Sequence, residues 1–210
     1  TKEFLEALGM PVIPWNLLND DPLPKQARSV IIPGGFPEQH CDQLSKCYRS
    51  LKGLKESYGS LPIYAECGGM LLLGQSVIDA LGRTYPMAGL LPFVTRKASL
   101  QVGYRSLKGI RDSLVIKEGE ELRGHEFHRW AISRLSFEGL STYETSLASQ
   151  PALFNSPWKV RGWKYAQRDE GWSNERLHAS WVHLHWASHP KLLQRWRAAL
   201  EKINNDAITS

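Results

Sequence analysis

The sequence has few cysteines and no long apolar run. Its three cysteines, Cys41, Cys47 and Cys67, are an odd number, and no secretory signal pattern precedes them. Free thiols of this kind are typical of the reducing cytosol and do not indicate a disulfide framework. No apolar run approaches the roughly 18 residues of a membrane-spanning helix. We therefore expect a cytoplasmic protein without a membrane partner.

Clusters of basic residues and nucleotide-binding motifs are also missing. Lys and Arg exceed Asp and Glu by 26 to 21, a net charge of +5, but the basic residues are scattered along the chain. No RNA- or DNA-binding motif is present, so no nucleic-acid partner is expected. The glycine-rich G-x-x-x-x-G-K-[ST] sequence that binds ATP phosphates is absent as well. Mild basicity also suits an enzyme whose substrate carries carboxylates.

The sequence does contain strand patterns that alternate with helix patterns. Its 210 residues, 42% of them apolar, suffice for one domain with a substantial core. Apolar runs at residues 29–35 and 61–67 indicate buried strands, and apolar side chains recur at helical spacing over residues 44–58. This alternation predicts an α/β fold with a mostly parallel sheet flanked by helices on both faces.

Other segments have weaker patterns. We expect a short helix followed by a strand in residues 3–15, a helix over residues 68–82, and short strands with many turns over residues 83–130. Residues 139–158 are polar and predicted to be rich in loops.

The end of the chain is predicted to form a strand and then a helix. The strand is expected at residues 179–186. The helix follows, with Ser188 as its N-cap and Pro190 in its first turn.

The sequence IYAECGGMLLLG, residues 63–74, places a thiol where a strand passes into a helix. Gly68 and Gly69 follow Cys67, and their small size permits a sharp turn that lifts the thiol above the sheet. The start of the next helix favours the thiolate form, and the Gly68 N–H can point toward an oxyanion. The pattern suits nucleophilic catalysis by Cys67, but a buried, inert cysteine fits it equally well.

A thiolate nucleophile needs a base, and seven histidines are available. His183 and His185 are two residues apart on the expected late strand, so their side chains should point to the same face. Both lie near the carboxyl end of that strand, where a parallel sheet places Cys67. Glu66 should face away from Cys67, because neighbouring strand residues alternate in direction, and we interpret it as structural support.

Metal binding is an alternative that the histidines leave open. Five of them, at positions 125, 128, 183, 185 and 189, could form a site with Cys67. His125 and His128 are three apart, which suits ligands on a helix. However, the surrounding sequence GHEFHRW is typical of a turn and a strand, and Cys41 and Cys47 lack a metal-ligand spacing. We therefore expect no metal site and interpret those two cysteines as structural.

Four segments in order, VIIPGGFPE, IYAECGGMLLLG, RGHEFH and ASWVHLHWASHP, resemble the glutamine amidotransferase domain of cobyrinic acid a,c-diamide synthases. The resemblance covers residues 29–190 and is supported by GRTYPMAGLLP and LQVGYR. It implies a flavodoxin-like domain of the class I, triad-type amidotransferases, which hydrolyses glutamine to glutamate and ammonia. The ammonia would serve amidation of the a and c carboxylates of cobyrinic acid in cobalamin (vitamin B12) biosynthesis.

In the family that the chain resembles, a synthetase domain performs the amidation and uses ATP and Mg²⁺. We therefore expect residues 1–210 to be one amidotransferase domain from the C-terminal part of a longer chain, or a subunit with a separate partner. No cofactor is expected in this domain itself. The implied partners are glutamine, the synthetase domain or subunit and, through it, a corrinoid polycarboxylate, and a homodimer is left open.

The resemblance also implies roles for single residues. Cys67 matches the nucleophile, and His183 matches the histidine that activates it. Related amidotransferases have H-x-E at this point, with the glutamate orienting the histidine. This chain has His185 instead of the glutamate, so a Cys–His pair is expected, with His185 as a candidate orienting residue.

Two further motifs correspond to substrate contacts in the family. The PGG turn matches the oxyanion strand, which makes the Gly35 N–H a candidate second donor beside Gly68. The segment GHEFH corresponds to the loop that binds the amino-acid end of glutamine. By this resemblance Glu126 would hold the substrate ammonium group and Phe127 would form a wall of the pocket.

Two alternatives to this function stay open. The same chemistry could serve another acceptor, such as hydrogenobyrinic acid, nickel sirohydrochlorin or a lipid-linked cell-wall precursor. Alternatively, the domain could be a catalytically weak docking or regulatory module for a synthetase, because eight tryptophans could form an apolar docking face. Burial of those tryptophans in the core is the simpler interpretation.

Overall fold

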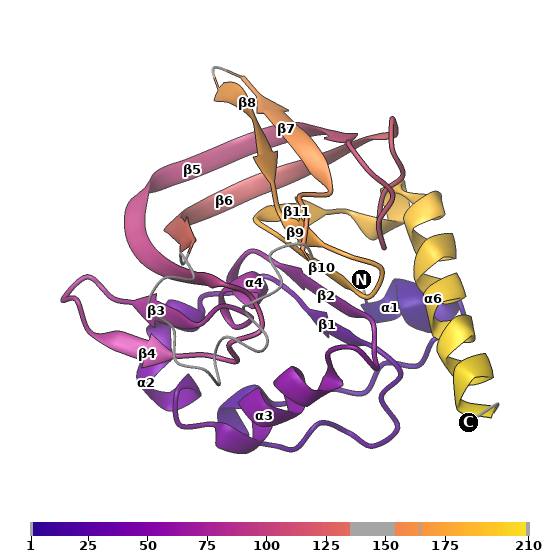
Figure 1. The fold of residues 1–210 in the computed structure, drawn as a ribbon, viewed down its shortest axis with the longest axis horizontal. Helices are drawn as coiled ribbons and strands as arrows, with labels where there is room; N and C mark the ends of the chain where they lie inside the picture. The colour runs from indigo at the N-terminus through magenta and orange to yellow at the C-terminus, as the bar shows by residue number, and fades with distance from the viewer. Residues whose placement is uncertain (1, 135–153, 164, 209–210) are drawn as a thin grey trace.

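The fold is an α/β arrangement of two sheets with helices packed around the smaller one (Figure 1). It is seen in a computed structural model that describes residues 2–134, 154–163 and 165–208. The smaller sheet has four strands in the spatial order β1 (Val30–Ile32), β2 (Ile63–Glu66), β10 (Leu177–Ser180) and β9 (Trp172–Ser173). The first three strands are parallel, and β9 runs antiparallel to β10.

The larger sheet is mostly antiparallel and is built on two long, curved strands. Its order is β11 (Val182–Leu184), β6 (Glu121–Arg134), β5 (Phe93–Gly109), β3 (Ser76–Ile78) and β4 (Thr84–Pro86). Two further strands, β7 (Trp158–Gly162) and β8 (Tyr165–Glu170), extend it from β5. Figure 1 shows β5 and β6 arching over the smaller sheet.

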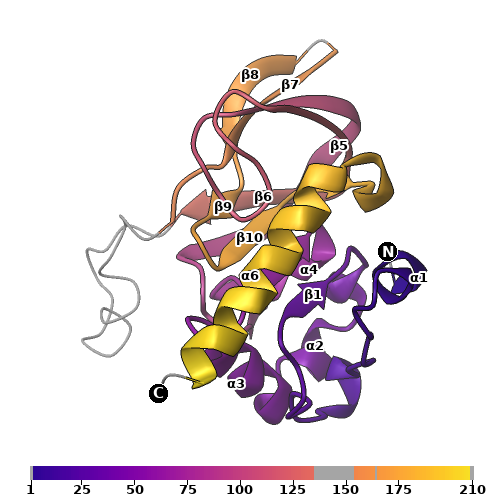
Figure 2. The ribbon, with the colours of Figure 1, turned by 90° about the vertical axis from the view of Figure 1, so that its right-hand side faces the viewer.

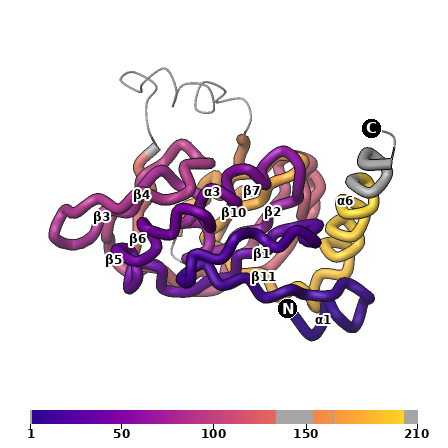
Figure 3. The backbone as a smooth tube through the Cα atoms, turned by 90° about the horizontal axis from the view of Figure 1, so that it is seen from below, coloured from indigo at the N-terminus to yellow at the C-terminus, as the bar shows by residue number. Residues whose placement is uncertain are grey.

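Helices lie on both sides of the smaller sheet. The described helices are α1 (Lys2–Ala7), α2 (Cys41–Leu44), α3 (Tyr48–Ser57), α4 (Gly68–Leu71) and α6 (Pro190–Ile208), with short 3₁₀ turns η1 (Leu17–Asn19), η2 (Pro37–Gln39) and η4 (Trp186–Ser188). Helices α1 and α6 lie on the same side of the molecule (Figures 1 and 3). Figure 2 shows α6 as one long, uninterrupted helix. None of the described helices is both long and apolar enough to cross a membrane.

Strand β2 contributes to two cores, one on each face. Ile63 and Ala65 point into a cluster that includes side chains of α2 and α3. Tyr64 points the other way, into a cluster with Trp186 and Trp196 of the C-terminal segment. Because both faces are covered, every residue of the strand up to position 65 is buried, and its sequence is a continuous apolar run.

The sequence predictions hold for the smaller sheet and for the flanking helices. The α/β class is confirmed by the order of the helices and strands. Two predicted buried strands form β1 and β2, and the predicted final helix begins at Pro190. The mostly parallel arrangement, however, describes only β1, β2 and β10, since the larger sheet is antiparallel apart from the β3–β5 pair.

Several element predictions were wrong. The helix expected over residues 68–82 ends at Leu71, and a β-carbon on Gly74 would collide with the Phe93 ring. Residues 76–78 then pair with β5 as strand β3. The strand expected before residue 15 does not form, because Pro11 and Pro14 provide no N–H for a ladder.

Other boundaries also differ from the predictions. The helix expected over residues 44–58 forms as α3 over residues 48–57, and Leu44 instead ends the separate helix α2. The late strand breaks at Trp181 into β10 and β11, and Ser188 lies within η4 instead of capping α6. Most of the segment predicted to be loop-rich, residues 139–153, lies outside the described residues.

Candidate active site

Cys67 lies at the junction of β2 and α4 in a strained backbone conformation. Its φ is 50° and its ψ is −117°, and Asp20 is the other described non-glycine residue with positive φ. Such a conformation costs about 1–3 kcal/mol and persists only where the surroundings enforce it. The Cys67 N–H donates to the Ser180 carbonyl at 2.7 Å, and the Cys67 carbonyl accepts from the Met70 N–H at 3.0 Å. These bonds hold the turn between β2 and α4.

The two glycines after the thiol let α4 pack directly on the turn that follows β1. A β-carbon on Gly68 would collide with the Gly35 carbonyl and lie 2.7 Å from the Pro37 ring. One on Gly69 would lie 2.7 Å from the Pro33 carbonyl oxygen. Both distances are shorter than real β-carbon contacts, so only glycine permits this approach. The glycines therefore bring the P-G-G turn of residues 33–35 next to the start of α4, directly after Cys67.

The structure brings His183 to Cys67. Strand β11 carries His183, whose Nδ1 atom lies 3.3 Å from Oε1 of Glu66. The interaction with the Cys67 side chain, followed by the hydrogen bond with Glu66, raises the pKa of His183 to about 10 against the opposing effect of burial. An imidazolium is therefore favoured at neutral pH. The charge of His183 therefore lies next to the Cys67 side chain.

Glu66 contacts the His183 ring. From the sequence, only a structural supporting role was expected for Glu66. Its second oxygen, Oε2, accepts a hydrogen bond from the Tyr64 hydroxyl at 2.8 Å and a longer one from the Leu184 N–H at 3.4 Å. The carboxylate is thus held by its own strand and by β11. Strand alternation did not reveal this contact, because the positive φ of Cys67 interrupts the strand directly after Glu66.

His185 does not orient His183, contrary to the expectation. Strand β11 ends at Leu184, so His185 is no longer held to the face that His183 occupies. Its side chain is exposed, and its Nδ1 atom lies 2.7 Å from the Ser188 hydroxyl oxygen. The structure therefore separates the two histidines that the sequence pattern placed together.

The two predicted oxyanion donors, Gly35 and Gly68, are neighbours in the structure, since the Gly35 carbonyl occupies the space of a Gly68 β-carbon. A cavity of about 400 Å³ lies against the same turn. Both glycines line it together with Trp15 and Phe36, whereas neither Cys67 nor His183 does. The cavity thus borders the turn that carries Gly35 and is not lined by Cys67 or His183.

Comparison with known proteins identifies the family to which this chain belongs. A family model described as a CobB/CobQ-like glutamine amidotransferase domain matches residues 3–191. The chain belongs to this family. It is 33% identical over 199 residues to a cobyrinate a,c-diamide synthase from Synechocystis sp., an alignment that covers 94% of this chain and 38% of the relative. The resemblance inferred from the motifs is thereby confirmed.

Two further comparisons extend this result. A hydrogenobyrinate a,c-diamide synthase from Streptomyces coelicolor is 33% identical over 196 residues, which are 92% of this chain and 36% of the relative. The chain therefore spans less than half the length of these relatives. A crystal structure of a glutamine amidotransferase shares the fold with a TM-score of 0.56 at 16% identity, covering 95% of this chain and 92% of that one.

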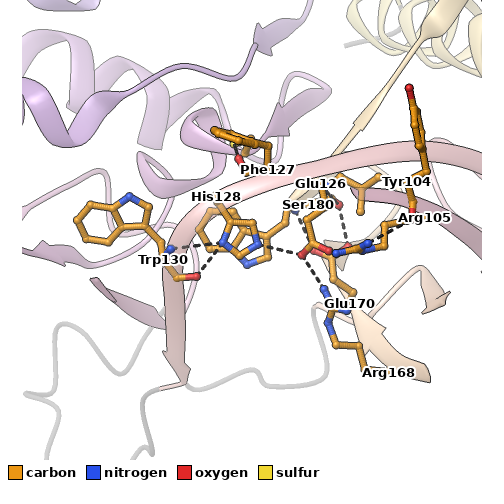
Figure 4. A network of polar contacts seen from close by, with 12 residues as sticks. Tyr104, Arg105, Glu126, Phe127, His128, Trp130, Arg168, Glu170 and Ser180 are labelled. Atoms are coloured by element: carbon orange, nitrogen blue, oxygen red, sulfur yellow. Dashed lines mark hydrogen bonds and ion pairs between the residues drawn. The ribbon is translucent and has the colours of Figure 1, made fainter. Parts of the chain in front are cut away.

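Glu126 lies in a buried charge cluster, which does not fit the expected contact with a substrate ammonium group (Figure 4). Its side chain is 0% exposed, and Oε1 accepts from Arg168 at 2.6 Å and contacts His128 Nε2 at 2.9 Å. Oε2 is paired with Arg105, which is also buried. Burial opposes the charged form, but these partners outweigh it and lower the pKa of Glu126 to about 2. Both oxygens are thus occupied by protein groups.

Phe127, by contrast, lies beside the thiol. Its backbone carbonyl accepts a hydrogen bond from the Cys67 thiol at 3.3 Å, and the residue is 44% exposed. His125 pairs in register with Tyr104 on one side and His183 on the other, so these three side chains share a face. Phe127 is two residues from His125 on the same strand and shares that face, on the other side of the strands from Glu126 (Figure 4). Its expected role as a pocket wall stays a prediction.

The remaining cysteines and histidines of this amidotransferase domain are dispersed. Burial raises the pKa of Cys41 to about 11, with Glu38 adding to it, and burial also raises the pKa of Cys47. His125 and His128 lie on strand β6 and not on a helix. Within residues 2–134, 154–163 and 165–208, no group of three or more His, Cys, Asp or Glu side chains is arranged to hold a metal ion.

Proposed function

We propose that this domain hydrolyses glutamine to glutamate and ammonia, with Cys67 as nucleophile and His183 as its acid–base partner. The observation that carries the proposal is the strained Cys67 turn, which presents a sulfur to a histidine whose pKa is raised toward the imidazolium form. Membership of the amidotransferase domain family supports the same reaction. Cys41 and Cys47, whose raised pKa values favour neutral thiols, are unsuited to this role.

The reaction begins when the Cys67 thiolate attacks the side-chain amide carbon of glutamine. The N–H groups of Gly35 and Gly68 stabilise the oxyanion of the tetrahedral intermediate, each by roughly 3 kcal/mol. His183 then donates its proton to the leaving nitrogen, and ammonia departs as the glutamyl thioester forms. Water, deprotonated by His183, hydrolyses the thioester to glutamate and restores the thiolate.

The ammonia is proposed to amidate the a and c carboxylates of cobyrinic acid in cobalamin biosynthesis, as the relatives' names suggest. That step requires a synthetase domain with ATP and Mg²⁺, which would act as the partner of this domain in the cytoplasm. A second candidate acceptor is hydrogenobyrinic acid, because a comparably similar relative is named for it. Supplying each acid to the complete enzyme with ATP and glutamine, and measuring the diamide formed, distinguishes the two.

Covalent labelling tests the hydrolytic step. The protein is treated with a diazoketone analogue of glutamine, and the modified residue is located by peptide mass mapping. We expect one adduct on Cys67, loss of glutaminase activity in proportion to labelling, and much slower labelling in His183→Ala at neutral pH. Cys41 and Cys47 are internal controls. An adduct on either of them in place of Cys67, or full glutaminase activity in Cys67→Ser, would overturn the proposal.

A further inference from the structure

We propose that Glu66 is the positioning residue of His183 and that Tyr64 fixes the carboxylate of Glu66. This inference rests on the proposed function, because it concerns the same histidine. Glu66 directly precedes Cys67, so one short segment at the end of β2 would supply both the nucleophile and the group that orients its base. The position two residues after His183, which carries His185, supplies no such group because that ring is turned to Ser188.

Three neighbours surround the His183 ring. Nδ1 faces Oε1 of Glu66 at 3.3 Å. The Cε1 edge lies against Gly34, where a β-carbon would collide with Cε1 and lie 3.1 Å from Nδ1 and 3.2 Å from Nε2. Because Nδ1 is engaged by a carboxylate, the neutral ring is favoured as the Nδ1–H tautomer. Nε2 then remains to exchange a proton with Cys67.

The carboxylate of Glu66 is itself held in place. Tyr64 is 1% exposed, and burial, reinforced by the charge of Glu66, raises its pKa well above the usual value. Its hydroxyl therefore stays protonated and donates to Oε2 at 2.8 Å. The Leu184 N–H reaches the same oxygen at 3.4 Å. With Oε2 occupied by these donors, Oε1 is the oxygen directed at His183.

This arrangement has a consequence for catalysis. When His183 takes a proton, the new positive charge lies next to a carboxylate that is 15% exposed and so only partly screened by water. Glu66 therefore stabilises the imidazolium that pairs with the Cys67 thiolate and later protonates the amide nitrogen, which leaves as ammonia. Hydrogen bonds to charged groups contribute about 1.5–3 kcal/mol, which corresponds to a 10- to 150-fold effect.

The test compares Glu66→Gln and Tyr64→Phe with a matched control, Glu56→Gln, which removes an exposed carboxylate on α3. Glutaminase kinetics are measured with the complete enzyme. We expect Glu66→Gln to lower kcat about 10- to 150-fold with little change in KM, and Tyr64→Phe to have a smaller effect. The rate of Cys67 alkylation is also measured as a function of pH. The step in this profile that reports deprotonation of His183 should move to lower pH in Glu66→Gln. The control should match the wild type.

A second measurement does not depend on turnover. In the Cys67→Ser background, ¹⁵N NMR of the histidine side chains should report the Nδ1–H tautomer for neutral His183, and adding Glu66→Gln should lower its pKa. An unchanged His183 pKa and tautomer, or wild-type kcat in a folded Glu66→Gln protein, would overturn the role of Glu66. Those outcomes leave the proposed function intact, whereas activity in Cys67→Ser would refute the function itself.

Discussion

The Cε1 edge of the His183 ring lies directly against the α-carbon of Gly34. The glycine belongs to the turn after β1, and the histidine belongs to β11 in the other sheet. This contact explains why a glycine precedes Gly35, the predicted oxyanion donor. Any side chain at position 34 would displace the ring from Glu66 or from Cys67.

Gly34→Ala should therefore inactivate the enzyme without unfolding it. Displacing a catalytic group by about 1 Å costs on the order of 100-fold in rate, and we expect a loss of that size in kcat/KM. Gly35→Ala is the matched comparison, because a β-carbon there meets no atom within 4 Å. We expect it to lose less activity than Gly34→Ala. Equal activity of Gly34→Ala and wild type in a glutaminase assay would contradict the contact.

The strain at Cys67 should be measurable as stability. Replacing Cys67 by glycine relieves the positive φ, whereas replacing it by alanine keeps the strain and removes only the sulfur. We expect Cys67→Gly to be more stable than Cys67→Ala by about 1 kcal/mol, the reverse of the usual order of these residues. Urea unfolding of the two variants gives the difference directly. A more stable alanine variant would show that the turn is not strained.

His178 should make the protein sensitive to acid. It is fully buried on β10 and stacks on Tyr64, and neither ring nitrogen has a hydrogen-bond partner among the described residues. Burial lowers its pKa to about 3, whereas the unfolded chain has the ordinary value of 6.5. The unfolded state therefore binds the proton first, and stability falls as pH drops from 6.5 to 3, by up to about 1.4 kcal/mol per pH unit.

His178→Phe keeps an aromatic ring in this site and removes the titrating group. The free energy of unfolding in urea should then depend less on pH between 7.5 and 5 than in the wild type. His40→Gln changes an exposed histidine and serves as the control. If His178→Phe loses as much stability at pH 5 as the wild type does, His178 is not the acid-sensitive group.

Removing Glu126 should destabilise the fold more than removing its exposed partner. Glu126→Ala leaves the guanidinium of Arg105, which is 2% exposed, without its carboxylate, and breaking a buried pair in this way costs about 3–5 kcal/mol. Arg168 has a side chain that is 39% exposed, so Arg168→Ala should cost less. Chemical denaturation of both variants at pH 7 tests this order.

The same cluster has a predictable pH dependence. The pKa of Glu126 is lowered to about 2 from an unperturbed 4.5. Its stabilising contribution is therefore complete above pH 4.5 and is lost as pH falls toward 2. Because Glu126→Ala lacks this group, its penalty relative to wild type should shrink between pH 5 and pH 2.5. A penalty that is constant over that range would argue against the ion cluster.

The sequence predicted the parts of the fold that depend on local pattern. Continuous apolar runs identified β1 and β2, and helical periodicity with a proline at the first position identified α6. The same reasoning placed a thiol at the exit of β2, opposite a histidine 116 residues later, and the structure brings these two residues into contact. The strand pattern indicated both His183 and His185, and the resemblance to the amidotransferase family selected His183, although this residue lies on β11 of the larger sheet and not on the parallel sheet that carries Cys67.

What the sequence did not predict depends on contacts between distant segments. The long strands β5 and β6 alternate between a buried and an exposed face, and the register shift between Lys97 and Gln101 obscures the pattern. The cations beside Glu126 come from positions 21 and 42 residues away. Glu66 was misjudged because the alternation rule assumes that the strand continues past it, and the backbone of Cys67 does not continue it.

The short link between β10 and β11 fixes the distance between Cys67 and His183. The carbonyl of Ser180 holds the amide of Cys67, and His183 follows only three residues later on the same stretch of chain. The distance between the Cys67 sulfur and the His183 ring is thereby set by the three residues after Ser180. It does not depend on the 116-residue separation of Cys67 and His183 in the sequence. Insertions within the long segment between these two residues can remodel the surroundings of the site while this distance is kept. One residue added between positions 180 and 183 would shift the histidine out of reach.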